Sequence, residues 1–80
     1  MTKTLQLSVG SVNHAIHGKR VLRRNGFRSW VRRRTEPTRE GCGYTLDVVL
    51  RSPDEQTAAL RLLAAAGVPL LGQRESGWDG

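Results

Sequence analysis

The sequence is poor in cysteine, aromatic side chains and long apolar runs, and each shortage excludes a class of protein. Its single cysteine, Cys42, cannot form an internal disulfide or a metal cage of several thiolates. The longest apolar run, residues 62–66, is far shorter than the roughly 20 residues of a membrane-spanning helix. Residues 1–10 alternate in polarity instead of resembling a secretory signal. We therefore expect a protein that does not span a membrane and is cytoplasmic.

The length of 80 residues leaves room for one small domain. We expect this domain to cover residues 4–72 and to be followed by a flexible tail over 73–80. A chain of this size buries only about 60% of its unfolded surface, so its core is small. Self-association would add stability, and a homodimer therefore stays open as an alternative.

Acidic residues are also scarce. The chain has seven of them and thirteen lysines and arginines, so its net charge is +6. The excess is concentrated, since residues 19–39 contain nine of the thirteen basic residues and a single acid, Glu36. This stretch predicts either a solvated face or a surface that binds an anionic partner.

The first half of the chain predicts a strand, a helix and a second strand. Residues 4–9 (TLQLSV) alternate with period two, as in a half-buried strand. Ser11 is a suitable N-cap for a helix that ends at Asn25 and Gly26, a typical left-handed C-cap. Residues 27–35 combine β-favouring side chains with arginines and predict a partly exposed edge strand. The apolar stripe of the helix consists of Val12, Ala15, Ile16 and Leu22.

The second half predicts the same three elements. Residues 44–51 alternate in polarity and indicate a third strand. Residues 52–55 (SPDE) place serine at the N-cap, proline at N1 and glutamate at N3, which predicts a capping box and the start of a helix. Gly67 ends this helix, and residues 68–72 are expected to form a fourth strand. The helical stripe consists of Ala59, Leu62, Leu63 and Ala66.

When the first half is shifted by 41 residues, residues of similar type in the two halves align. Corresponding pairs include Leu5 with Leu46, Ser11 with Ser52, and Gly26 with Gly67. Two packed β-α-β halves are typical of a ferredoxin-like β-α-β-β-α-β sandwich. We therefore predict an α+β fold with an antiparallel sheet of strand order 4-1-3-2 and both helices on one face.

This topology predicts an activated thiol. The loop 36–43 should lie at the end of the sheet where the first helix begins, so Cys42 is expected to face that helix terminus. Unpaired N–H groups and about half a positive charge at a helix N-terminus stabilise a thiolate. His14 in the first turn and Arg39, three residues before the cysteine, favour the same anion. An ordinary turn cysteine is the alternative.

Other chemistries receive less support. A Cys–His hydrolase lacks an acid placed to orient His14, and 80 residues leave no deep pocket. We therefore expect a carrier or binding protein rather than an enzyme. His14 and His17 alone make a poor metal site, and no phosphate-binding loop is present, so no metal or cofactor is predicted.

One set of residues carries a family resemblance. The matching residues are Pro37, Arg39, Glu40, Cys42 and Gly43, followed by a β-rich segment, and residues 13–22 (NHAIHGKRVL). In these residues the chain resembles the small sulfur/selenium carrier-like proteins, over about residues 4–72. The family loop has a longer spacing before its cysteine. The resemblance implies that Cys42 holds a terminal sulfur or selenium atom as a persulfide or its selenium counterpart. It also implies a donor enzyme and an acceptor protein.

The basic stretch supports an alternative function. The candidate docking residues for a partner or for nucleic acid are Arg28, Trp30, Arg32, Arg33 and Arg34. An RNA-recognition module would carry stacking aromatics on the open face of the first and third strands, and the residues expected on that face include none. Binding driven by the phosphate backbone therefore remains the second hypothesis. A structural dimer that covers the arginine-rich edge is the third.

Overall fold

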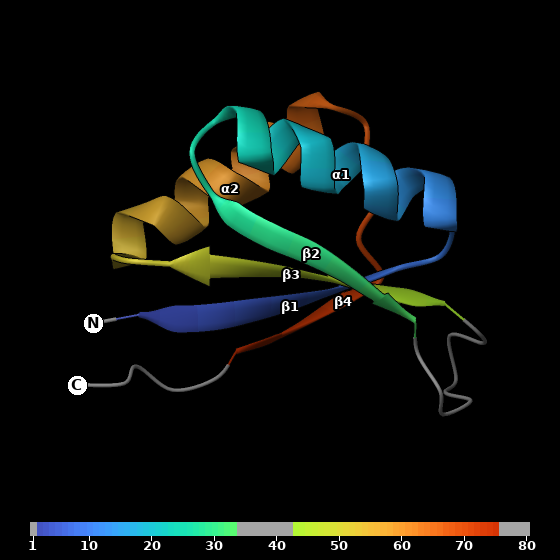
Figure 1. Ribbon diagram of the computed structural model, residues 1–80, viewed down its shortest axis with the longest axis horizontal. Helices are drawn as coiled ribbons and strands as arrows, with labels where there is room; N and C mark the ends of the chain where they lie inside the picture. Colours follow the sequence, from blue (N-terminus) through green and yellow to red (C-terminus); the bar gives the residue numbers. More distant parts are fainter. Residues whose placement is uncertain (1, 34–42, 76–80) are drawn as a thin grey trace.

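The computed structural model describes residues 2–33 and 43–75, and it has an α+β fold. The elements, in chain order, are β1 (Lys3–Val9), α1 (Val12–Arg24), β2 (Arg28–Arg33), β3 (Tyr44–Leu50), α2 (Pro53–Ala65) and β4 (Gly72–Glu75). Both helices lie on one face of a four-stranded antiparallel sheet (Figure 1). The strand order is β2-β3-β1-β4, which is the expected order 4-1-3-2 counted from the opposite edge.

The core lies between the sheet and the helices, and strand alternation positions its residues. The helix-facing leucines and valines of β1 and β3 are fully buried. They pack against the buried residues of α1 and α2. The twelve core residues are Leu5, Leu7, Val9, Ala15, Leu22, Phe27, Leu46, Val48, Leu50, Ala59, Leu63 and Val68.

The two helices end in the same way, as the internal repeat predicts. Gly26 and Gly67 both have positive φ, 86° and 75°, a conformation that favours glycine. After α1, the N–H of Phe27 donates to the carbonyl of Leu22 at 3.0 Å, and the equivalent bond after α2 is also 3.0 Å. Both ends are therefore Schellman motifs, which satisfy carbonyls that have no partner within the helix.

The helix starts differ, and the predicted capping box is wrong. At α1, the hydroxyl of Ser11 accepts from the N–H of His14 at 3.2 Å, as expected of an N-cap. At α2, within the described residues, the side chain of Ser52 makes no capping hydrogen bond. The carboxylate of Glu55 instead accepts from the N–H of Arg51 at 2.6 Å and pairs with its guanidinium at 2.7 Å. These bonds hold the pKa of Glu55 below its ordinary value.

The strand boundaries also differ from the expectation, by one residue at β1 and at β3 and by more at β4. The fourth strand covers residues 72–75, not 68–72, because Val68 is buried at the end of α2 and closes that helix. Residues 73–75 thus pair with β1 instead of belonging to a tail, and residues 76–80 lie outside the described part. The second strand begins at Arg28 and not at residue 27 as expected, and residues 34 and 35 of the expected strand lie outside the described residues.

Gly18 allows α1 to approach the sheet and α2 closely. The buried positions of α1 are Ala15, Gly18 and Leu22, whereas Val12, expected in the stripe, is 40% exposed. A Cβ at Gly18 would lie 2.7 Å from a methyl group of Leu46.

Neither of the described helices is both long and apolar enough to cross a lipid bilayer.

A branched side chain at position 18 should therefore weaken the fold. We expect Gly18→Val to lower the free energy of unfolding by about 2 kcal/mol or more, because overpacking a close helix contact typically costs about 1–3 kcal/mol. Urea denaturation followed by circular dichroism measures the change. Gly72→Val is the matched control, since no described atom lies within 4 Å of its Cβ position. Equal losses in the two variants would contradict the packing argument.

Candidate functional site

The residues of the predicted thiol site are only partly described. Cys42 and Arg39 lie outside the described residues. His14 lies in the first turn of α1 with its side chain exposed. Within α1, all of which is described, the first turn contains no acidic side chain. An anion beside this helix terminus would therefore meet no opposing charge from that turn.

The register of the strands positions the residues on either side of the segment 34–42. Arg33, before the segment, pairs with Tyr44, after it, and Tyr44 pairs with Val9 at the end of β1. Val9 is followed by the turn that leads to Ser11, the N-cap of α1. The flanks of the segment and the start of α1 therefore lie at the same end of the sheet (Figure 1).

A second candidate site lies on the sheet face opposite the helices, which we call the open face. Its described residues are Thr4, Gln6 and Ser8 on β1, Arg28, Trp30 and Arg32 on β2, Thr45, Asp47 and Val49 on β3, and Arg74 on β4. Trp30 is 40% exposed. The structure divides the predicted docking residues, because alternation places Arg33 on the helix side of β2 and Arg34 lies outside the described residues.

Asp47 is the buried acid of the open face. It is only 2% exposed, although strand alternation places it on the side away from the core. Arg32 forms an ion pair with its carboxylate, with Nε at 2.9 Å from one oxygen and a terminal nitrogen at 3.3 Å from the other. The side chain of Trp30, its register partner, also interacts with this carboxylate. The ion pair therefore holds Arg32 beside Trp30 on β2.

Burial has the larger electrostatic effect on this carboxylate. Desolvation raises the pKa of Asp47 above its ordinary value, although the hydrogen bond and charge of Arg32 and the hydrogen bond of Trp30 act in the opposite direction. Keeping the aspartate ionised at neutral pH therefore costs folding free energy. Sequence analysis missed this residue, because alternation indicates a side of the sheet and does not show which neighbours cover it.

Ser29 fixes β2 against β3 from the helix side. It is 1% exposed, and its hydroxyl donates to the backbone carbonyl of Asp47 at 2.7 Å. The carbonyl of Ser29 accepts from Nε of Arg23 on α1 at 3.2 Å. These bonds hold the strand that presents Trp30 and Arg32.

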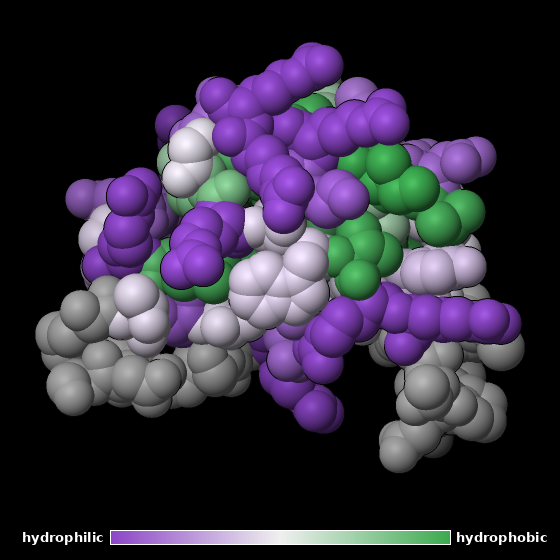
Figure 2. All heavy atoms as spheres, in the orientation of Figure 1, coloured by the Kyte–Doolittle hydropathy of each residue, from purple (hydrophilic) through white to green (hydrophobic). Residues whose placement is uncertain are grey.

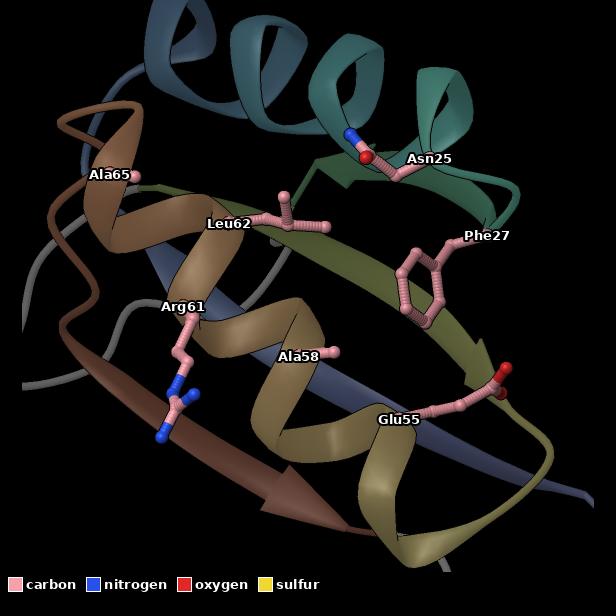
Figure 3. A pocket seen from close by; sticks show the side chains of 7 residues that line it. All are labelled: Asn25, Phe27, Glu55, Ala58, Arg61, Leu62 and Ala65. Carbon is pink, nitrogen blue, oxygen red and sulfur yellow. The ribbon is translucent and has the colours of Figure 1, made fainter.

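A groove lies between the end of α1 and α2. Figure 3 shows the side chains of Phe27, Ala58 and Leu62 pointing into it. Glu55, at one end, is paired with Arg51. Among residues 2–33 and 43–75, no three His, Cys, Asp or Glu side chains are grouped to hold a metal ion. The groove therefore combines apolar side chains with polar groups from Asn25, Glu55 and Arg61.

Comparison with models of protein families and with curated protein sequences gives no match to this chain.

Replacing Asp47 tests its electrostatic role. Because its pKa is raised, the folded protein holds this proton to a higher pH than the unfolded chain does, so the contribution of Asp47 to stability falls as pH rises through that window. Asp47→Asn keeps a hydrogen-bond acceptor and does not titrate. We expect the stability of the variant, relative to the natural protein, to increase between about pH 3 and pH 7.

Urea denaturation at several pH values measures this difference. Taking the difference between the two proteins cancels the titration of Glu55, whose lowered pKa acts with the opposite sign. A difference that stays constant, or one that shrinks as pH rises, would contradict the assigned effect of burial.

Proposed function

We propose that this protein is a sulfur or selenium carrier that holds the transferred atom on Cys42. The supporting observation is the register that joins Arg33, Tyr44 and Val9, because it brings the flanks of the segment 34–42 to the end of the sheet where α1 begins. A thiolate or persulfide at this end would be stabilised by the helix N-terminus. The resemblance of residues 13–22 and 37–43 to carrier-like proteins supports the same proposal.

The transfer step is an exchange at sulfur. The Cys42 thiolate attacks the terminal sulfur of a donor persulfide, forms a new S–S bond and breaks the S–S bond of the donor, whose thiolate leaves. The products are a Cys42 persulfide and the donor thiolate, so no external oxidant or reductant is needed. A terminal selenium atom would move by the same displacement. A thiolate of the acceptor protein then attacks the terminal sulfur in the same way, and the Cys42 thiolate leaves.

In this proposal the neighbouring residues stabilise the anion. The guanidinium of Arg39 supplies a fixed positive charge, and His14 donates a hydrogen bond from the exposed first turn of α1. The protein works with a donor enzyme and an acceptor protein, and it is cytoplasmic, where thiols stay reduced. It transfers an atom between partners and does not turn over a substrate alone.

We also assign the α+β fold to the ferredoxin-like type. Three features support this assignment: the order β2-β3-β1-β4, the antiparallel pairing, and the two helices on one face.

Replacement of the thiol tests the carrier function. After incubation with a small-molecule persulfide, the natural protein should gain the mass of one sulfur atom on Cys42, and Cys42→Ser should gain none while keeping its circular dichroism spectrum. Intact-protein mass spectrometry measures the gain. Sulfur bound to the serine variant would refute the proposal.

A pair of histidine variants tests the surroundings of the thiol. His14→Ala should slow loading about tenfold, because a hydrogen bond to a charged group contributes about 1.5 kcal/mol. His17→Ala is the matched control, since His17 is also exposed and lies three residues further along α1. Equal rates for the two variants would contradict a role for His14.

A further inference from the structure

The open face combines positive charge with an exposed aromatic ring. Arg28 and Arg32 lie on either side of Trp30 along β2, and side chains two residues apart in a strand are separated by about 7 Å. Arg74 is exposed on β4, at the other end of the cross-strand row that begins at Trp30. These three arginines give the described part of the open face a positive charge, which favours an anionic partner. Figure 2 views the molecule from the β2 edge and shows hydrophilic side chains over much of α1 and β2.

The carboxylate of Asp47 on this face does not repel an anionic partner. Asp47 is covered, and its charge is paired with Arg32, whose own side chain remains 52% exposed. Trp30 lies directly across from Asp47 and is 40% exposed, so its ring is accessible to a ligand.

The rest of the open face distinguishes nucleic acid from an acidic protein. The central strands present mainly polar side chains there, including Gln6, Ser8 and Thr45. A protein interface has an apolar core at its centre, which these residues do not supply. Nucleic-acid interfaces are more polar and more positive, and bases stack on single aromatic rings beside arginines. The composition thus favours a nucleic acid with unpaired bases.

We propose that the open face binds single-stranded nucleic acid without strong sequence preference. A base stacks on Trp30, and the neighbouring phosphates are bound by Arg28 and Arg32. Arg74 extends the contact across the sheet. Asp47 positions Arg32 before the ligand arrives. This inference does not depend on the carrier function of Cys42.

Fluorescence anisotropy with the full chain tests the proposal. The probe is a fluorescein-labelled oligothymidine of about 12 nucleotides, titrated at several salt concentrations between about 50 and 200 mM. We expect the affinity to fall steeply with salt. The slope of log K against log salt should become shallower by about 0.7 when one phosphate-binding arginine is removed.

The variants separate stacking from charge. Trp30→Ala should weaken binding about 5- to 150-fold with little change in the salt slope, and Trp30→Phe, which keeps a ring, should retain most of the affinity. Arg28→Ala and Arg74→Ala should weaken binding and reduce the slope. Arg33→Ala is the matched control, because it removes the same charge from the opposite side of β2. Circular dichroism establishes that each variant is folded.

Three results would overturn the proposal. The first is that the protein fails to bind the oligonucleotide at the lowest salt concentration, the second that Arg28→Ala and Arg33→Ala lose affinity equally, and the third that folded Trp30→Ala keeps the full affinity. A polyglutamate peptide or vesicles of anionic lipid that bind as tightly as the oligonucleotide, with the same dependence on Trp30, would also overturn it in favour of an acidic protein or a membrane.

Discussion

The central strands β1 and β3 are joined in seven register pairs, from Lys3 with Leu50 to Val9 with Tyr44. Because side chains alternate along a strand, a slip of one residue would move every buried side chain of one strand to the open face. The register therefore determines which leucines reach α1 and α2. It also places Tyr44 opposite Val9, at the end of the sheet where α1 begins. The pairing of β2 with β3 places Arg33 opposite Tyr44 and Trp30 opposite Asp47. Both candidate sites therefore depend on the register of β3 with its two neighbouring strands.

Burial of side chains has opposite effects on stability on the two faces of the sheet. On the helix side, burial of apolar side chains stabilises the fold, and Gly18 lets α1 pack close to that layer. On the open face, burial of the Asp47 carboxylate has an energetic cost that its partners only partly offset. Replacing such a group with an apolar residue often increases stability, so the acid at this position does not serve to maximise stability.

The elements that the sequence predicted well are those with strong local signals. Period-two alternation identified β1 and β3, and Gly26 and Gly67 marked both helix ends because their positive φ requires almost no side chain. The fourth strand was misplaced because the apolar Val68 serves the end of α2, and apolarity alone does not distinguish a closing contact from a strand. The partner of Glu55 was wrong by one residue for a similar reason, since spacing does not fix which N–H a flexible carboxylate reaches.

The candidate sites were less predictable than the fold. The arginines of β2 were evident as a charged stretch, but their division between two faces depends on where the strand begins. The burial of Asp47 depends on the side chains of two neighbouring residues on β2, which no local pattern encodes. For the thiol site, the described structure fixes the flanks and His14, whereas Arg39 and Cys42 lie outside it.

The carrier proposal requires that Cys42 is ionised at neutral pH. The most direct test is the rate of its alkylation by iodoacetamide as a function of pH, since only the thiolate reacts. The account predicts that the rate stays high well below the ordinary thiol range, down to about pH 6. A rate that falls with a midpoint near about 8.5, as for an unperturbed thiol, would contradict it.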